Sequence, residues 1–546
     1  MTKNIIKISG NIVDVVQKNI FKGEIIIKNG KIIDIIKKDN VNEGYILPGL
    51  INSHVHIESS MLTPCEFAKI AVKHGTVATV SDPHEIANVL GVAGVDFMIE
   101  NSKKTPFKFF FGAPSCVPAT EFETSGSRLD SKEIEELLKR DDVHFLSEVL
   151  NYPGVINNDE DLLKKIEIAK KYNKKIDGHA PLLNGEELMI YAKAGISTDH
   201  ECINIEEAIE KIKHGIKIQI REGSAAKNFQ ALYKLIDEYP DSVMLCTDDS
   251  HPTDLIDGHI NLIVKNAINK KLDIFNILRA VTYNPVKHYN IPVGLLQKND
   301  NADLIVIDNL KDFNILKTYI NGVLVYENDK SLIVAENNIE INNFSCNPIE
   351  KQSISVKSNS LKNIKVIEVL DGELFTNKII FKPKIKNNEI VSDIENDILK
   401  IVVVNRYKNE PTKVGFIKNF GLKHGAIAES ISHDSHNIIA VGVDDENIVK
   451  AINKIIENKG GIIYCNDKEE YILKLEIAGL MSKDDVYTVA EQYKLIEEKA
   501  KENGILLKAP FMTLSFMSLL VIPQIKIGDK GLFDVNKFQI TSVYNE

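Results

Sequence analysis

The stretch ILPGLINSHVH at residues 46–56 decides the fold. It is an apolar run that ends in two histidines, and the pattern LTPCEFAKIAVKHG at 62–75 follows it. Apolar residues recur in that second pattern at spacings of three and four, which indicates an amphipathic helix. A buried strand followed by a helix is the repeating unit of parallel α/β folds. The sequence therefore predicts a strand and a covering helix at this point.

The same pattern, an apolar run followed by a helical segment, repeats along the chain as far as about residue 290. Eight such units in about 250 residues is the size of a (β/α)8 barrel. A doubly wound open sheet is the competing arrangement, but no GxGxxG follows the first strand. We therefore expect an α/β protein with a TIM-like barrel over 47–299. The later apolar runs are TVATVSDPHE (76–85), FKFFFGAPSC (107–116), VHFLSEVLN (143–151), KKIDGHAP (174–181), GISTDHE (195–201), GIKIQIREG (215–223) and SVMLCTDDSHP (242–252).

Strand patterns flank the barrel on both sides. Residues 1–46 alternate Ile-rich runs with turns, and an Asn-Gly pair at 29–30 predicts a tight hairpin. Residues 300–336 carry the same pattern, with a second Asn-Gly pair at 321–322. We expect the two flanks to join into one small β-sheet domain built from both sides of the barrel.

Beyond the second flank the character of the chain changes again. A polar, Asn- and Ser-rich stretch at 337–360 indicates a linker. Apolar runs such as ILKIVVVN and GGIIYC follow it, together with the helical pattern VKAINKIIEN. The sequence therefore predicts a separate C-terminal α/β domain over 361–546.

The composition excludes several classes of protein. Lys and Arg number 66 against 77 Asp and Glu, and the resulting formal charge of -11 repels phosphate backbones and anionic lipid. We therefore expect neither nucleic-acid nor membrane partners. The most apolar stretch, 511–525, is shorter than the ~20 residues that a membrane-spanning helix needs. The first residues lack a signal-peptide pattern and the cysteines form no CxxC pair, so a cytoplasmic location is expected.

Histidines and charged residues gather where the predicted strands end. In a barrel the carboxyl ends of all eight strands meet at one mouth. Imidazole and carboxylate groups together are ligands for Zn, Mn or Fe, so the pattern indicates a metal site at that mouth. The residues at these ends are His54, His56, Asp82, His84, Glu85, Glu148, His179, His200, Arg221, Glu222, Asp248 and Asp249.

The two histidines of the first strand are the strongest single signal. His54 and His56 are two residues apart, so both imidazoles face the same side of the strand and can hold one metal ion. A bare pair of this kind is more often structural, but the units that follow it favour ligation. His179 and His200 end strands that face the same mouth. Asp248 ends the last strand, where a carboxylate can bind metal and take a proton from metal-bound water.

These strand-end motifs resemble the amidohydrolase superfamily. Its signature is HxH after the first strand, an acid or a carbamylated Lys after the fourth, His after the fifth and sixth, and Asp after the eighth. Glu148 stands at the fourth position, where the hydantoinase and dihydroorotase relatives have Lys. Longer segments resemble the bacterial adenine deaminase family within that superfamily. They are PGLINSHVHIESSML (48–62), SDPHEIANVLG (81–91), PATEFETSG (118–126), REGSAAKN (221–228), CTDDSHPTDL (246–255) and the C-terminal HGAIAESISHDSHNIIAVG (424–442).

The resemblance implies hydrolysis of adenine to hypoxanthine and ammonia, with the purine base and water as the reacting partners. It also implies two divalent metal ions, with Mn or Fe favoured and Zn compatible with the same ligands. Purine salvage or adenine catabolism is the expected setting, and a homodimer is expected. The metal ligands implied are His54, His56, Glu148, His179, His200 and Asp248.

Deamination also requires groups that move protons. Asp248 would receive a proton from the attacking water and pass it to the departing amine. Attack loads negative charge onto the ring nitrogen N1, so a carboxylic acid is needed there, and Glu58, Glu85, Glu121 and Glu222 are the candidates. The expected catalytic residues are Asp248, Glu85 and Glu148. The expected substrate-binding residues are Glu58, Asp82, His84, Glu121, Arg221, Glu222 and Asp249.

Some of these residues also have purely structural interpretations. Asp82 is placed to cap a helix, which is compatible with a role in the site. Glu121 is equally consistent with a solvated loop, and Arg221 with an ion pair to Glu222 beneath the mouth.

The C-terminal motif SHDSHN and the overall activity leave further alternatives. His433 and His436 follow no predicted barrel strand, so surface positions are the simpler interpretation, with pocket closure or a dimer contact as alternatives. Another amidohydrolase, such as an imidazolone hydrolase or an N-acyl amidase, is the competing activity. A barrel that has lost catalysis is the non-enzymatic alternative.

Overall fold

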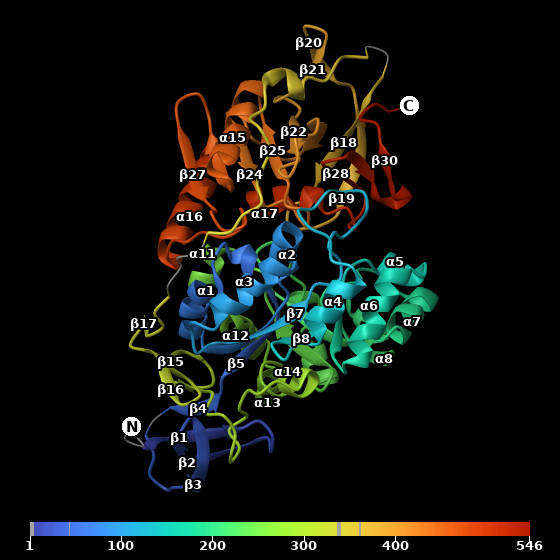
Figure 1. The fold of residues 1–546 in the computed structure, drawn as a ribbon. Coiled ribbons are helices and arrows are strands. Elements are labelled where there is room, and N and C mark those ends of the chain that lie inside the picture. The colour runs from blue at the N-terminus through green and yellow to red at the C-terminus, as the bar shows by residue number, and fades with distance from the viewer. Residues whose placement is uncertain (1–4, 43, 336–339, 360–361, 546) are drawn as a thin grey trace.

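The structure is a computed structural model that describes residues 5–42, 44–335, 340–359 and 362–545. A barrel lies at the centre, with a small β sheet at one end and the C-terminal domain at the other (Figure 1). Among the described residues, no helix is long and apolar enough to cross a membrane.

Eight parallel strands form the wall of the central barrel, one in each of the eight apolar runs predicted from the sequence. Their β-branched and aromatic residues are buried between the barrel interior and the surrounding helices. The predicted barrel is therefore confirmed. The strands are β5 (Leu50–His56), β6 (Thr76–Ser81), β7 (Lys108–Ala113), β8 (Val143–Val149), β9 (Lys175–Gly178), β10 (Thr198–Asp199), β11 (Lys217–Arg221) and β12 (Val243–Cys246).

The eighth strand joins the two ends of the wall. β12 pairs with β11, and after Thr247 the chain continues as β13 (Asp248–Asp249). β13 pairs in parallel with β5, opposite Val55 and His56. The end of the last strand is thereby held beside the histidine pair of the first.

Helices surround the barrel and turn their apolar faces to its strands. Side-chain caps mark several of their starts: Asp130 forms a capping box with Glu133, and Asn204 accepts a hydrogen bond from Glu207 N. The helices are α1 (Pro64–Ala71), α2 (His84–Leu90), α3 (Val92–Ser102), α4 (Ser131–Leu138), α5 (Tyr152–Ile156), α6 (Glu160–Lys171), α7 (Gly185–Lys193), α8 (Ile205–Lys213), α9 (Phe229–Leu232), α10 (Leu235–Glu238), α11 (Pro252–Asp257), α12 (Ile260–Asn269), α13 (Ile274–Ala280) and α14 (Tyr283–Tyr289).

The strands on the two flanks of the barrel form one eight-stranded sheet in the order β17-β16-β15-β14-β4-β1-β2-β3. Both predicted Asn-Gly turns close hairpins, with positive φ at Asn29, Gly30, Asn321 and Gly322. The residue boundaries assigned to the domains stay predictions. The strands are β1 (Ile5–Asp14), β2 (Asn19–Lys28), β3 (Lys31–Lys37), β4 (Tyr45–Pro48), β14 (Leu304–Ile307), β15 (Ile315–Ile320), β16 (Val323–Glu327) and β17 (Lys330–Ser331).

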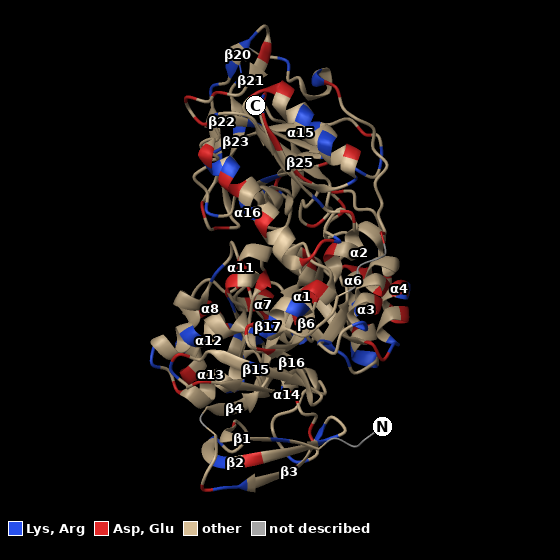
Figure 2. Ribbon diagram, turned by 90° about the vertical axis from the view of Figure 1, so that its left-hand side faces the viewer, with Lys and Arg blue, Asp and Glu red and all other residues tan. Residues whose placement is uncertain are grey.

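The C-terminal region contains a second eight-stranded sheet, in the order β19-β18-β23-β22-β25-β24-β26-β27. Charges of both signs mix along its outer helices α15 and α16 (Figure 2). A C-terminal α/β domain is therefore confirmed. Its main elements are β18 (Ile364–Val369), β19 (Thr376–Phe381), β22 (Ile398–Val404), β23 (Lys413–Lys418), β24 (Ala426–Glu429), β25 (Ile438–Gly442), α15 (Asp445–Asn458), β26 (Gly461–Cys465), β27 (Glu470–Lys474), α16 (Val486–Glu502), α17 (Pro510–Ser515), the 3-10 turn η4 (Phe516–Ser518), β28 (Ile525–Gly528) and β29 (Gly531–Asp534).

The seam between β9 and β10 is held by hydrogen bonds outside a regular ladder. Ser197 N donates to Ile176 O at 2.8 Å. Ala180 N donates to Asp199 Oδ2 at 2.9 Å, so a buried carboxylate ties the end of β9 to β10. A cation is needed nearby, because a buried carboxylate without a partner is costly.

Buried Lys211 of α8 supplies that cation. Its Nζ donates to Ala180 O at 2.6 Å and to Glu207 Oε1 at 2.8 Å, and lies 3.2 Å from Asp199 Oδ1. We expect Lys211→Met to lower the free energy of unfolding by about 3–5 kcal/mol, because two carboxylates lose their buried cation. Urea-induced unfolding measures this loss. Lys213→Met, on the exposed face of the same helix, is the control, and an equal loss in both variants would contradict the assignment.

Candidate metal centre

β5 places two imidazoles at one point of the barrel mouth. The Nε2 atoms of His54 and His56 lie 3.2 Å apart, and both side chains are buried. Asp248 Oδ1 lies 3.4 Å from the first of these nitrogens and 3.2 Å from the second. Two imidazole nitrogens and a carboxylate oxygen therefore converge on one small volume.

Glu148, at the end of β8, stands between this group and a second pair of histidines. Its Oε1 lies 3.5 Å from His56 Nε2. Its Oε2 lies 3.2 Å from both His179 Nδ1 and His200 Nε2. The two oxygens thus face different histidines, which is the arrangement that a carboxylate needs to bridge two cations. All six side chains predicted as ligands lie in this one cluster.

The chemistry of this cluster fits divalent metal ions. Several of its groups of three or four donors lie within 4.8 Å of one another, and all of them are buried. Burial lowers the pKa of His179, but Glu201 and Glu148 outweigh it and raise that pKa to about 9. Burial raises the pKa of Glu148, but His179 and His200 hold it well below its usual range. The buried carboxylates thus require positive charge beside them, which metal cations on imidazole and carboxylate ligands supply.

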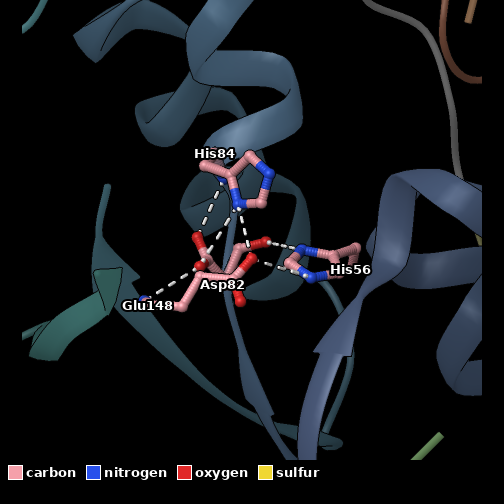
Figure 3. A group of neighbouring side chains, drawn as sticks. All are labelled: His56, Asp82, His84 and Glu148. Carbon is pink, nitrogen blue, oxygen red and sulfur yellow. Dashed lines mark hydrogen bonds and ion pairs between the residues drawn. The ribbon is translucent and has the colours of Figure 1, made fainter. Parts of the chain in front are cut away.

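Asp82 and His84 attach the start of α2 to the same cluster (Figure 3). Asp82 Oδ1 accepts a hydrogen bond from His84 N at 3.0 Å, and its Oδ2 accepts one from Glu148 N at 3.2 Å. The His84 imidazole points toward Glu148, with Nδ1 3.6 Å from Oε1. Asp82 therefore binds the first backbone N–H of α2 and also lies in the site cluster.

Glu85, also in the first turn of α2, contacts the C-terminal domain. Its Oε1 lies 2.7 Å from His433 Nδ1, and its Oε2 forms a hydrogen bond with His436 Nε2. His433 and His436 are 4% and 1% exposed, so the interpretation of these residues as surface residues is wrong. The loop 430–437 turns toward the barrel mouth, and no local sequence pattern reveals a contact with a residue about 350 positions away.

Arg221 pairs with a residue that the sequence analysis did not single out. It forms a two-pronged ion pair with Glu201, and its Nη1 donates to Asp248 Oδ2 at 2.6 Å. The alternative pair with Glu222 is wrong, because neighbouring strand residues point to opposite sides. Glu222 instead accepts a hydrogen bond from Phe229 N at 3.3 Å. The sequence feature that could have identified Glu201 as a site residue is its position directly after His200, at the end of a barrel strand.

The remaining predicted site residues divide into two groups. Asp249 lines the cavity and accepts a hydrogen bond from Ser59 Oγ. Glu58 is buried just behind it, where its Oε1 accepts a hydrogen bond from Ile86 N at 3.2 Å. Glu121 points away from the cluster: its side chain is 82% exposed and faces Arg128. The structure therefore does not bring Glu121 to the cavity, because its loop turns it to solvent, and its predicted role in substrate binding stays a prediction.

A small cavity lies over the cluster, and both domains line it. The barrel supplies most of its charged groups, and the C-terminal domain adds His433 and Asp434. Apolar side chains complete the lining, so the cavity suits a small ligand with an apolar face and polar edges. These apolar residues are Leu150, Ala226, Leu374, Phe516, Leu519 and Val521.

Two family models match the chain. Residues 45–325 match the family model described as the amidohydrolase family, and residues 373–539 match the one described as the adenine deaminase C-terminal domain. A solved β-aspartyl dipeptidase from Fervidobacterium islandicum is 14% identical, with a TM-score of 0.47 over 61% of this chain and 98% of that chain. The matched model defines the class: the central domain is an amidohydrolase domain.

Curated relatives cover the whole chain. A protein named adenine deaminase from Methanosarcina mazei is 54% identical over 550 residues, which are 98% of this chain and 99% of the relative. Another of that name, from Borreliella burgdorferi, is 51% identical over 545 residues, with the same two shares. The chain belongs to the adenine deaminase family.

Glu123, two residues after the exposed Glu121, gives this region a pH-dependent stability. Burial, with Asp434 and Asp529 nearby, raises the pKa of Glu123 to about 8. An unfolded Glu releases its proton near pH ~4.3. Stability should therefore fall as the pH rises from about 4.3 to about 8, because only the folded state keeps the proton there.

Glu123→Gln should remove this part of the pH dependence, because an amide keeps the acceptor for Thr120 N without a titrating group. Thermal unfolding midpoints of wild type and variant, measured across that pH range, test this. Glu121→Gln is the matched control and should behave as wild type. Parallel curves for wild type and Glu123→Gln would refute the prediction.

Proposed function

We propose that this protein catalyses the hydrolytic deamination of adenine, giving hypoxanthine and ammonia. One observation carries the proposal: Glu148 faces His56 with one oxygen and His179 and His200 with the other, within a chain about half identical to proteins named adenine deaminase along its whole length. Purine salvage or adenine catabolism in the cytoplasm and a homodimeric assembly stay predictions.

Two divalent cations, Mn or Fe by family resemblance, are part of this proposal. Bound ions lower the pKa of a water molecule and so supply hydroxide at neutral pH. One ion would be held by the two histidines of β5, and the other by the histidines that end β9 and β10. The proposed ligands are His54, His56 and Asp248 for the first ion, His179 and His200 for the second, and Glu148 between them.

Asp248 is proposed as the group that moves the proton of the attacking water to the departing amine. Its Oδ1 faces the two histidines of β5, at 3.4 and 3.2 Å. Its Oδ2 is held by Arg221 at 2.6 Å, and Arg221 is fixed in turn by Glu201. The carboxylate is thereby oriented with one oxygen toward the reacting centre, which is the geometry that proton transfer requires.

The ring nitrogen N1 is proposed to receive its proton from the pair formed by Glu85 and His84. Glu85 alone among the four candidate carboxylic acids lines the cavity. Its Oε1 lies 3.4 Å from His84 Nε2. Burial lowers the pKa of His84, but Asp82 and Glu85 outweigh it and raise that pKa well above its usual value, so the His84 imidazolium beside the Glu85 carboxylate would hold the proton for N1. Glu58 lies behind the cavity, whereas Glu121 and Glu222 face away from it.

Metal removal tests the proposed cofactor. Protein stripped of metal should lose adenine deamination, because hydroxide is then scarce at neutral pH, and should recover it with Mn(II) or Fe(II). Ammonia release and elemental analysis are measured together, with about two ions per chain expected at full activity. Hydantoin and N-acyl amino acids serve as control substrates and should release no product. Full activity in verified metal-free protein would end the proposal.

Glu148→Gln tests the central carboxylate. Turnover should fall at least about a thousandfold, because an amide has no charge to offset two cations and bridges them poorly. Metal content should fall in the same variant. Glu222→Gln, also at the end of a barrel strand but outside the cavity lining, is the control and should keep nearly normal turnover. Normal turnover and metal content in Glu148→Gln would reject its role.

A further inference from the structure

We propose that His433 and His436 are positioning residues that hold the Glu85 carboxylate in the cavity, so that the C-terminal domain completes the active site. The inference deepens the proposed function and rests on it for the task of Glu85. The contact itself stands on the geometry of the three side chains.

The two imidazoles contact different oxygens of the Glu85 carboxylate. His433 Nδ1 lies 2.7 Å from Oε1 of Glu85, and His436 Nε2 forms a hydrogen bond with Oε2. Oε1 also lies 3.4 Å from His84 Nε2. Since each oxygen has a separate partner from the C-terminal domain, both the position and the rotation of the carboxylate are fixed.

The loop 430–437 that carries the imidazoles is itself well anchored. The His433 ring stacks on Phe516, with ring centroids 4.9 Å apart. Ser435 O accepts a hydrogen bond from Tyr407 Oη at 2.7 Å. Asn437 Nδ2 donates to Thr124 O at 2.9 Å, which ties the loop to the barrel. The imidazoles are therefore held by the domain, and they can fix a carboxylate on another domain.

Charge also favours this arrangement. Burial raises the pKa of Glu85, but His433, His84 and His436 hold it well below its usual range. Burial lowers the pKa of His433, but Glu85 outweighs it and raises it well above normal. The buried carboxylate thus has a charged partner in His433. Nδ1 of His436 has no hydrogen-bond partner among the described residues, as expected when its proton is on Nε2.

A cation held by His84, Glu85 and Asp434 is the competing explanation for these buried groups, because their donor atoms lie within 4.8 Å of one another. The two explanations differ in a measurable way. A cation site loses a metal ion when a ligand is removed, whereas a positioning contact leaves the metal content unchanged.

The decisive experiment is a double-mutant cycle between His436 and Glu85 in the metal-loaded enzyme. His436→Leu should lower turnover of adenine about 10- to 100-fold, because the carboxylate is no longer held. In a Glu85→Ala background the same change should cost less than about twofold, because no carboxylate remains to be positioned. A similar loss in both backgrounds would mean a merely structural role and would overturn the inference.

Conservative variants and a matched control sharpen the test. His436→Gln keeps an N–H donor near the position of Nε2, and His433→Asn keeps one near Nδ1. Both should retain turnover within about fivefold of wild type, whereas His433→Leu should not. His424→Leu, on an exposed segment of the same domain, should have no effect. Loss of about one metal ion per chain in His436→Leu would overturn the inference in favour of a cation site.

Thermal unfolding of the same four proteins separates this inference from the proposed function. His436→Leu should lower the unfolding midpoint in wild type more than in Glu85→Ala, whether or not adenine is the substrate. If the midpoints couple but the turnovers do not, the contact exists without positioning a reacting group, and the inference fails. If wild type releases no ammonia from adenine, the proposed function fails, and the midpoints still test the contact.

Discussion

The burial of several carboxylates at one end of a parallel barrel is the constraint on which the rest of the structure depends. A carboxylate removed from water must find positive charge or hydrogen-bond donors. At the mouth, Glu148 finds histidines on both sides, and Asp248 finds Arg221. Glu85 finds His84 on its own helix and two further imidazoles on the other domain. Each of these pairings fixes a side chain that the proposed chemistry uses.

The barrel geometry brings these buried carboxylates and their partners together. Parallel strands end at the same edge, so residues far apart in the chain arrive at one place. The division of the last strand into β12 and β13 extends this principle, since the second part pairs with β5 and sets Asp248 beside His56. A buried lysine on α8 stabilises the seam between β9 and β10, which have no regular ladder between them. The barrel thus holds two sets of buried charges: Lys211 and its carboxylate partners stabilise the wall, whereas Asp248 and its neighbours form the site at the mouth.

Much of this arrangement could be predicted from the sequence because it depends on local patterns combined with one geometric rule. Apolar runs gave the eight strands, and the rule that parallel strands end together brought His54, Glu148 and Asp248 to one mouth. The contact of Glu85 with His433 and His436 depends on how a separate domain docks, which has no local signal. The exposure of Glu121 could not be predicted for a related reason: a loop has no fixed period, so the pattern could not distinguish it from the buried Glu123 two residues later.

The contribution of the C-terminal domain explains why the cavity has two kinds of lining. The barrel mouth alone offers charged groups, which water would screen. Phe516, Leu519 and Val521 come from the segment after α17, and they cover the mouth with apolar surface. Exclusion of water strengthens the electrostatic interactions of the charged groups beneath. Once water is excluded, the Glu85 carboxylate needs other partners, and the same domain supplies them as imidazoles. The docked C-terminal domain therefore both covers the site and holds the Glu85 carboxylate.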